Sequence, residues 1–243
     1  MASEDKANDN KRVMLIVAHP DDGEFMAAGT LAKWAKEGQE ITYVLCTSGD
    51  KGTSDPELPP EKLAVIRERE QRGAAKVVGA KEVVFLGYKD GVLENTLELR
   101  RDIVRQIRLH RPDVVVCQDP TRHISHFYLN HPDHRAAAGA ALDAVFPSAR
   151  DYHVFPELIS EGLMPHKVHE VYLGGAGDEG TVWIDITDTI ETKIRALTEH
   201  KSQVGEDSES LTKLGERVKE GAQRTGEGRA VDYAEAFRYI KLR

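Results

Sequence analysis

The chain has 243 residues, of which 40% are hydrophobic and 30% charged, so it can bury the core of a soluble α/β protein. Its formal net charge of −8 disfavours a nucleic-acid binder, whose surface would be basic, and no apolar run approaches the roughly 20 residues that span a bilayer. Residues 1–11 are polar and predict a flexible tail and no secretory signal. Cys46 and Cys117 lie in apolar runs, as small buried residues do. We therefore expect a cytoplasmic protein.

Apolar runs and helical patterns alternate along the first 147 residues. The runs that predict strands are 12–18, 41–47, 83–86 and 113–117. The patterns that predict helices are 24–36, 61–78, 96–110 and an alanine-rich stretch that begins near 135. This alternation favours a mostly parallel sheet with helices on both faces, and we expect the strand order 3-2-1-4. Further strands should follow in the carboxyl-terminal third.

The remainder of the chain is less regular. Its patterns predict strands at 168–173 and 181–186, helices at 188–200 and near 210–219, and an aromatic segment that docks at 233–239. No linker or internal repeat divides the sequence, so we expect a single α/β domain. Its expected parts are the tail 1–11, a core 12–147 and a carboxyl-terminal elaboration 148–243.

Two histidine-containing motifs stand at the ends of two of the expected strands. His19-Pro20-Asp21-Asp22 follows the first strand, and His131-Pro132-Asp133-His134 lies beyond the fourth, on the first turn of a helix. In the order 3-2-1-4 these strands are neighbours, and a ligand crevice opens between them because the chain reverses its winding there. We therefore expect both motifs to face one crevice.

Three residues of the two motifs form a candidate metal site. His19, Asp22 and His134 offer two imidazoles and one carboxylate, an open set that leaves room for water or substrate. This composition suits catalytic Zn²⁺ and also other divalent first-row metals such as Fe²⁺. A water molecule activated by the metal becomes a nucleophile, so the motifs predict metal-assisted hydrolysis of an acyl bond, most simply an amide.

The other residues of the motifs suggest acid–base roles. Asp21 is a spare carboxylate beside the ligands and is the candidate general base. His131 is the candidate for stabilising the oxyanion or protonating the leaving amine. Asp133 is expected to orient the His131 imidazole by accepting its second N–H.

Each motif alone has a simpler explanation, either a polar turn or a pair of solvated histidines, and it is their joint placement that favours a site. For His123 and His126, in the loop before the second motif, a substrate role competes with a surface role. The other histidines are expected to be surface or packing residues: His110, His153, His166, His169 and His200. The arginines after the third strand are expected to form a solvated helix face: Arg100, Arg101, Arg105 and Arg108.

The two motifs resemble those of the PIG-L/LmbE-like family of metal-dependent N-acetylglucosaminyl de-N-acetylases. The resemblance extends through Arg67-x-x-Glu70, Leu86-Gly87-x-x-Asp90-Gly91 and Arg111-Pro112-Asp113-Val114-Val115, and covers about residues 12–145. It implies a Rossmann-like fold and hydrolysis of N-acetyl groups from glucosamine-containing substrates with zinc or another divalent metal. It also implies the roles given above to the two motifs: metal ligands His19, Asp22 and His134, general base Asp21, and oxyanion stabiliser His131 with Asp133 behind it.

The resemblance further implies a set of substrate contacts. These are Arg67, Asp90 and the loop at Ser48 to Gly49. Some members of the family carry a tyrosine two residues before the first histidine of the second motif. Here Leu129 holds that position and Tyr128 lies one residue earlier, so Tyr128 is a displaced candidate for this role. Glu24 is expected to cap or brace the first helix rather than to bind metal.

Alternative functions stay open at this point. The same metal site would serve an amidase of larger conjugates or a non-sugar N-acyl hydrolase. A metal-binding, Rossmann-like interaction module is an alternative without catalysis, but it leaves Asp21 and His131 unexplained. A dinucleotide-binding module is disfavoured because His-Pro-Asp-Asp replaces a Gly-x-Gly-x-x-Gly turn. We expect a small acetamido-sugar substrate and no nucleic-acid partner, and we leave homo-oligomerisation open.

Overall fold

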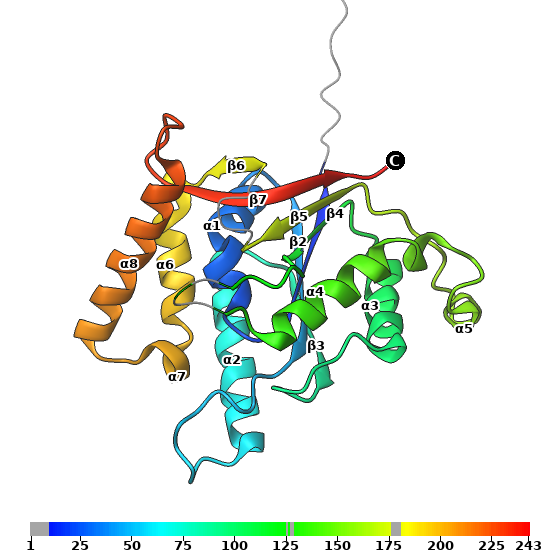
Figure 1. Cartoon of the computed structure of the whole chain (residues 1–243), viewed down its shortest axis with the longest axis horizontal. Coiled ribbons are helices and arrows are strands. Elements are labelled where there is room, and N and C mark those ends of the chain that lie inside the picture. Colours follow the sequence, from blue (N-terminus) through cyan, green and yellow to red (C-terminus); the bar gives the residue numbers. More distant parts are fainter. Residues whose placement is uncertain (1–9, 125, 127–128, 176–180) are drawn as a thin grey trace, which may run out of the picture.

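A seven-stranded sheet forms the centre of the molecule in the computed structural model, which describes residues 10–124, 126, 129–175 and 181–243 (Figure 1). The strands are β1 (Arg12–Val17), β2 (Glu40–Thr47), β3 (Glu82–Tyr88), β4 (Val114–Gln118), β5 (Glu170–Gly174), β6 (Val182–Asp185) and β7 (Ala234–Lys241). Their order is β3-β2-β1-β4-β5-β7-β6. The first five run parallel, whereas β7 is antiparallel to both β5 and β6. The expected order 3-2-1-4 and the added carboxyl-terminal strands are confirmed.

Helices cover both faces of this sheet. They are α1 (Asp22–Lys36), α2 (Pro60–Val78), α3 (Leu97–His110), α4 (Pro132–Val145), α5 (Pro156–Ser160), α6 (Ile190–Thr198), α7 (Lys201–Val204) and α8 (Ser208–Gly226). One core cluster joins α1, α2 and α6 to the sheet, and a second joins α3 and α4 to its other face. The three-layer α/β fold is therefore confirmed. No helix in the described part of the chain is long and apolar enough to cross a membrane.

The alternation of side chains along β1 explains how one strand serves two cores. Met14 and Ile16 point into the cluster with α3 and α4, whereas Leu15 points into the cluster with α1 and α2. Gly23, in the first turn of α1, lets that turn pack directly on Leu15, because a Cβ at Gly23 would lie 2.4 Å from Leu15 Cδ2. The start of α1, which carries Asp22, is thereby fixed against the end of β1.

The largest differences from the sequence-based expectations lie after residue 186. The segment expected as a docking aromatic stretch is strand β7, and the short helix expected near 210–219 is α8, which extends over Ser208–Gly226. The helix expected at 188–200 is divided into a 3₁₀ turn, Thr187–Thr189, and the helices α6 and α7. Strand β7 depends on pairing with β5 and β6, and such long-range pairing leaves no local pattern.

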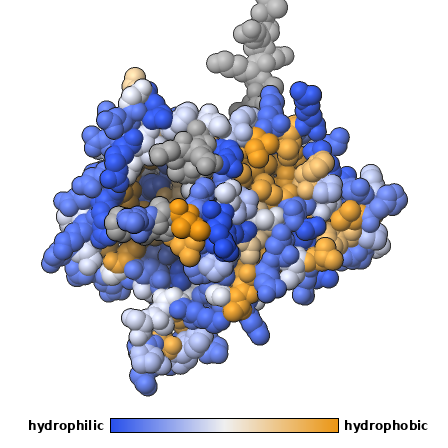
Figure 2. All heavy atoms as spheres, in the orientation of Figure 1, coloured by the Kyte–Doolittle hydropathy of each residue, from blue (hydrophilic) through white to orange (hydrophobic). Residues whose placement is uncertain are grey.

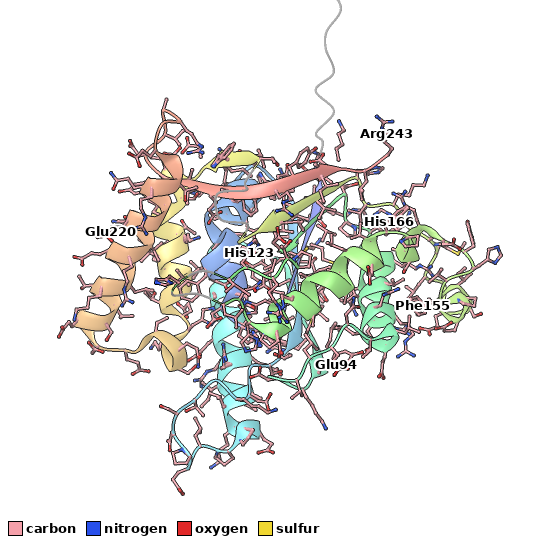
Figure 3. The ribbon with its side chains drawn as sticks, in the orientation of Figure 1. Glu94, His123, Phe155, His166, Glu220 and Arg243 are labelled. Atoms are coloured by element: carbon pink, nitrogen blue, oxygen red, sulfur yellow. The ribbon has the colours of Figure 1, made fainter. Side chains whose placement is uncertain are left out.

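Arg108 does not belong to the solvated face predicted for α3. It is 2% exposed, and its guanidinium donates hydrogen bonds to backbone carbonyls between residues 148 and 155. One acceptor is the carbonyl of Phe155, which is labelled in Figure 3. The prediction was wrong for this residue because helical spacing does not reveal that an irregular segment folds over that side of α3.

Candidate metal and catalytic site

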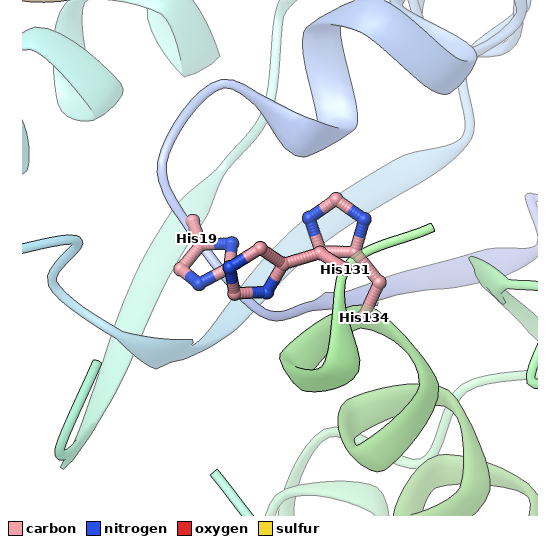
Figure 4. Close-up of side chains that lie close together, drawn as sticks. All are labelled: His19, His131 and His134. Atoms are coloured by element: carbon pink, nitrogen blue, oxygen red, sulfur yellow. The ribbon is translucent and has the colours of Figure 1, made fainter. Parts of the chain in front are cut away.

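The two histidine motifs meet at the carboxyl ends of neighbouring strands. β1 and β4 pair in parallel, with Ile16 opposite Cys117, so the segments that follow them emerge side by side. His19 lies in the turn after β1, and His131 is the N-cap residue of α4. Figure 4 shows the imidazoles of His19, His131 and His134 close together. The expectation that both motifs share one crevice is therefore met.

Asp22 lies between the two imidazoles that were predicted to share a metal ion with it. Its Oδ1 is 3.0 Å from His134 Nε2, and its Oδ2 is 3.4 Å from His19 Nδ1. Ring nitrogens of His19, His131 and His134 all lie within 4.8 Å of one another. Imidazole nitrogens and a carboxylate oxygen are the donors that Zn²⁺ and other divalent first-row ions take, so the residues present fit such an ion. His131 is a fourth group within reach.

The second nitrogen of His19 faces acidic groups. His19 Nε2 lies 3.0 Å from Asp90 Oδ1 and 3.4 Å from Asp133 Oδ2. These residues are also close enough to His19 to form a group that could hold a cation. Carboxylates behind a ligating histidine fix its ring orientation and raise its basicity. Asp90 and Asp133 are thus placed to orient His19.

Asp21 has a different environment from Asp22. Its backbone is in the left-handed region, with φ of 85°, and its N–H donates to Gln71 Oε1 over 3.0 Å. Arg67 Nη2 lies 3.2 Å from Asp21 Oδ2 and also donates to the Pro20 carbonyl over 2.7 Å. The two consecutive carboxylates therefore point to different partners, as expected if one binds metal and the other takes a proton.

The pKa values of these two carboxylates are shifted in opposite directions. Burial raises the pKa of Asp21 above its ordinary value, and the negative charge of Asp22 adds to the rise. Burial acts the same way on Asp22, but hydrogen bonds with His134 and His19 outweigh it and hold the Asp22 pKa well below its usual range. Burial lowers the pKa of His19, yet contacts with Asp22 and Asp90 prevail and raise it to about 10. Carboxylates whose pKa values are pushed apart are suited to different roles.

The expected contact between His131 and the Asp133 carboxylate is not formed. Asp133 Oδ1 lies 3.8 Å from His131 Nδ1, too far for a hydrogen bond. Instead the backbone N–H of Asp133 donates to His131 Nδ1 over 3.1 Å, and the Asp133 carboxylate accepts from the N–H groups of Gly91 and Leu93. The reason is that His131 caps α4, which brings its ring back to the first helical turn. With Nδ1 as acceptor, the neutral ring carries its proton on Nε2.

Of the four expected substrate contacts, Arg67 and Asp90 lie at the site. Arg67 is 4% exposed and donates to the Gly49 carbonyl, and Asp90 accepts from the Lys51 N–H over 2.9 Å. Ser48 donates to Glu68 on α2 over 2.8 Å, and its role as a substrate contact stays a prediction. Tyr128 lies outside the described residues, so its role stays a prediction.

Sequence reasoning missed a buried polar chain behind Asp21. Gln71, whose Oε1 accepts from Asp21, donates through Nε2 to Glu24 over 3.0 Å, and Glu24 lies 3.2 Å from His200 Nε2. All three side chains are 1% exposed or less. Glu24 braces the first helix as expected. Gln71 lies on α2 and His200 in the turn between α6 and α7, and neither belongs to a motif, so no signal in the sequence could have found them.

A pocket of about 380 Å³ opens at this place. Its lining includes Asp22 and His134 together with Gln118 and Asp119 at the end of β4. His123, on the loop between β4 and α4 (Figure 3), has its Nε2 3.9 Å from Asp119 Oδ1. A pocket of this size, with ligating and ionisable groups converging on it, has the features of a small-molecule site.

Comparison with known proteins points to one family. A family model described as PIG-L, GlcNAc-PI de-N-acetylase, matches residues 14–145, which carry both motifs. The chain is 36% identical over 200 residues to a diacetylchitobiose deacetylase of Thermococcus kodakarensis, covering 82% of this chain and 73% of the relative. It is 27% identical over 222 residues to a probable N-acetyl-alpha-D-glucosaminyl L-malate deacetylase 2 of Bacillus anthracis, covering 89% and 91%.

A solved structure supports the same relationship over nearly the full length. The N,N'-diacetylchitobiose deacetylase of Pyrococcus horikoshii, complexed with its inhibitor, superposes with a TM-score of 0.86 at 30% identity. The match covers 99% of this chain and 88% of that one. The likeness thus includes the carboxyl-terminal third, where the family model does not reach.

Proposed function

The chain belongs to the PIG-L family, and from that premise we propose that it is a metal-dependent hydrolase that removes the N-acetyl group from an acetamido sugar of the N-acetylglucosamine type, or from a conjugate of one. Relatives whose names describe deacetylases of such sugars support the substrate class. The observation that carries the proposal is the convergence of His19, Asp22 and His134 on one point, with the separate carboxylate of Asp21 beside it.

His19, Asp22 and His134 would hold a divalent metal ion, Zn²⁺ or another first-row ion such as Fe²⁺. Such an ion, when bound, supplies a Lewis acid that lowers the pKa of water and polarises a carbonyl oxygen. Asp90 and Asp133 contribute by facing the second nitrogen of His19. The imidazole and carboxylate groups gathered here could hold a metal ion, and they do not identify which one.

Asp21 is the proposed general base that removes a proton from the attacking water. Arg67 donates to the Asp21 carboxylate and Gln71 accepts the Asp21 backbone N–H, so the residue is held in place before the reaction. Its raised pKa brings its basicity closer to that needed near neutral pH.

His131 is the proposed oxyanion stabiliser. Because Nδ1 accepts the N–H of Asp133, the ring proton on Nε2 is free to be donated to the developing oxyanion. The side chain is 44% exposed, so a substrate can reach it. The cytoplasmic location expected from the sequence stays a prediction.

Acetate release tests the proposal directly. The purified protein, supplied in turn with Zn²⁺ and Fe²⁺, is incubated with N-acetylglucosamine, its glycosides and diacetylchitobiose, and with acetylated amines that carry no sugar. We expect acetate from the sugars at a higher kcat/KM than from the amines. Equal or faster turnover of the acetylated amines would favour a non-sugar N-acyl hydrolase, and no turnover with either metal would contradict the assignment.

A further inference from the structure

A second and larger cavity adjoins the pocket of the site. It encloses about 710 Å³ between α8, β7 and the start of α1, and it shares Phe25, Met26 and Gly175 with the smaller pocket. Phe25 and Met26 follow Asp22 by about one turn of α1, which is roughly 5 Å along the helix axis. The larger cavity, here called the α8 groove, therefore begins one helical turn from a proposed metal ligand.

The floor of the α8 groove is apolar and built from small or medium side chains. Leu214, Val218 and Ala222 contribute from α8, and Ala234 and Ala236 contribute from β7. Figure 2 shows the hydrophilic outer side of α8 on the left, with apolar residues visible in the recess behind it. An apolar concave surface beside a polar site favours a ligand that has an apolar part.

The ionisable side chains of the groove are mainly cationic. Lys193 and Glu235 are buried and paired at 2.6 Å, so their charges cancel. Lys213 and Arg217 lie exposed on α8, where Lys213 pairs with Glu209 and Arg217 Nε donates to the Lys213 carbonyl. Arg217 therefore adds positive charge to the mouth of the groove, in a chain whose net charge is −8. This local sign favours an anionic ligand group.

We infer that the α8 groove binds the part of the substrate that is attached to the acetamido sugar, and that this part is an apolar group carrying an anion. The inference rests on the proposed function, because it places the acetamido group at the metal site. The aglycone would then cross Phe25, a residue that is 49% exposed and lines both cavities. An exposed aromatic ring at that position offers a surface for the sugar or the aglycone to pack on.

A pair of substrates that differ only in charge tests this inference. The 4-carboxyphenyl and 4-carbamoylphenyl glycosides of N-acetylglucosamine, as both anomers, have the same shape, and only the first is anionic. We expect the wild-type protein to have the higher kcat/KM for the carboxylate. Arg217→Glu should lower this preference by about five-fold, the upper end of what an exposed ion pair contributes.

The matched control is Arg224→Glu. It makes the same charge change on the same helix, but Arg224 lines a different cavity near residues 226–232. The control should keep the preference for the carboxylate. Val218→Trp provides an independent test, because the larger side chain should fill part of the α8 groove. It should lower kcat/KM for both glycosides more than for N-acetylglucosamine itself.

The outcomes separate this inference from the proposed function. Acetate release with no preference between the two glycosides would exclude the α8 groove as the aglycone site but would not affect the proposed deacetylase activity. An equal effect of Arg217→Glu and Arg224→Glu would lead to the same conclusion. If no acetamido sugar released acetate, the proposed deacetylase activity would be excluded. The α8 groove would then also be excluded as a substrate site. A change of oligomeric state in Arg217→Glu, measured by sedimentation and without a change in preference, would make the groove an interface between copies.

Discussion

Asp21 and Asp22 are adjacent in the chain, yet the carboxylate of Asp21 pairs with an arginine and that of Asp22 with a histidine. Asp22 lies 3.0 Å from His134 Nε2, whereas Asp21 lies 3.2 Å from Arg67 Nη2. The left-handed backbone of Asp21, directly before α1 begins, turns the two side chains apart. A dipeptide can therefore supply one metal ligand and one base, and the two assignments can be tested separately.

Replacement of Asp21 by asparagine should abolish catalysis without affecting the metal. Asparagine keeps the shape of the side chain but cannot take a proton, so kcat should fall by about 10²- to 10⁴-fold. Metal content, measured by elemental analysis, should stay at the wild-type level. Asp55→Asn, at an exposed position of the loop after β2, is the matched control and should keep full activity. Wild-type turnover in Asp21→Asn would exclude Asp21 as the general base.

Metal binding should be visible as stability, independently of activity. If the ion binds only the folded chain, its addition at about one hundred times Kd stabilises by about 2.7 kcal/mol, and the melting temperature rises accordingly. His134→Ala should lose this rise because it removes a ligand beside Asp22. His153→Ala, at an exposed histidine, should keep it. An equal rise in His134→Ala and in the wild type would place the metal elsewhere.

Gln71 should matter for turnover although it lies behind the reacting groups. It accepts the N–H of Asp21 and donates to Glu24, so Gln71→Met leaves both polar groups without that partner. We expect a loss of about 1–3 kcal/mol in the free energy of unfolding. We also expect a lower kcat at unchanged metal content, because the backbone N–H of Asp21 then loses its acceptor. Gln223→Met, at an exposed glutamine of α8, should change neither quantity.

Arg108 should contribute to stability through the carbonyl groups that it binds. Its guanidinium donates to the carbonyls of Ser148, Asp151 and Val154, among others, and burial lowers its pKa. Arg108→Met should lower the free energy of unfolding in urea by about 2–5 kcal/mol, because several buried acceptors lose their donor. Arg101→Met, on the same helix, should cost at most about 0.5 kcal/mol. Similar costs for the two variants would refute this role of Arg108.

His166 should make stability depend on pH below neutrality. Burial lowers its pKa in the folded protein, while its Nε2 donates to the Pro112 carbonyl over 2.7 Å. The unfolded chain therefore binds a proton first, and this residue's contribution to stability is lost as pH falls below about 6.5 towards the lower folded pKa. His166→Gln can keep the hydrogen bond but does not titrate. Between pH 7 and 5 its free energy of unfolding should fall less steeply than that of the wild type.

The sequence predicted the site better than it predicted the carboxyl-terminal third. Residues 12–147 carry local signals, since each strand is an apolar run and each helix has a spacing or a cap, such as Thr96 before α3. Strand β7 and the extent of α8 depend on partners far away in the chain. The same limit applies to Arg108 and His200, whose burial is decided by segments that pack over them.

Within the site, the sequence by itself determined which residues are present and at which strand ends they stand. A parallel sheet brings the ends of β1 and β4 together, so two motifs more than a hundred residues apart could be assigned to one crevice. Only the tertiary structure decided which atoms meet. The Asp133 carboxylate accepts hydrogen bonds from the backbone of Gly91 and Leu93 and not from the ring of His131. Gln71 lies behind Asp21 and accepts its backbone N–H. The physical reason is that hydrogen bonds depend on distance and direction within a few tenths of an ångström, which packing sets and residue order does not.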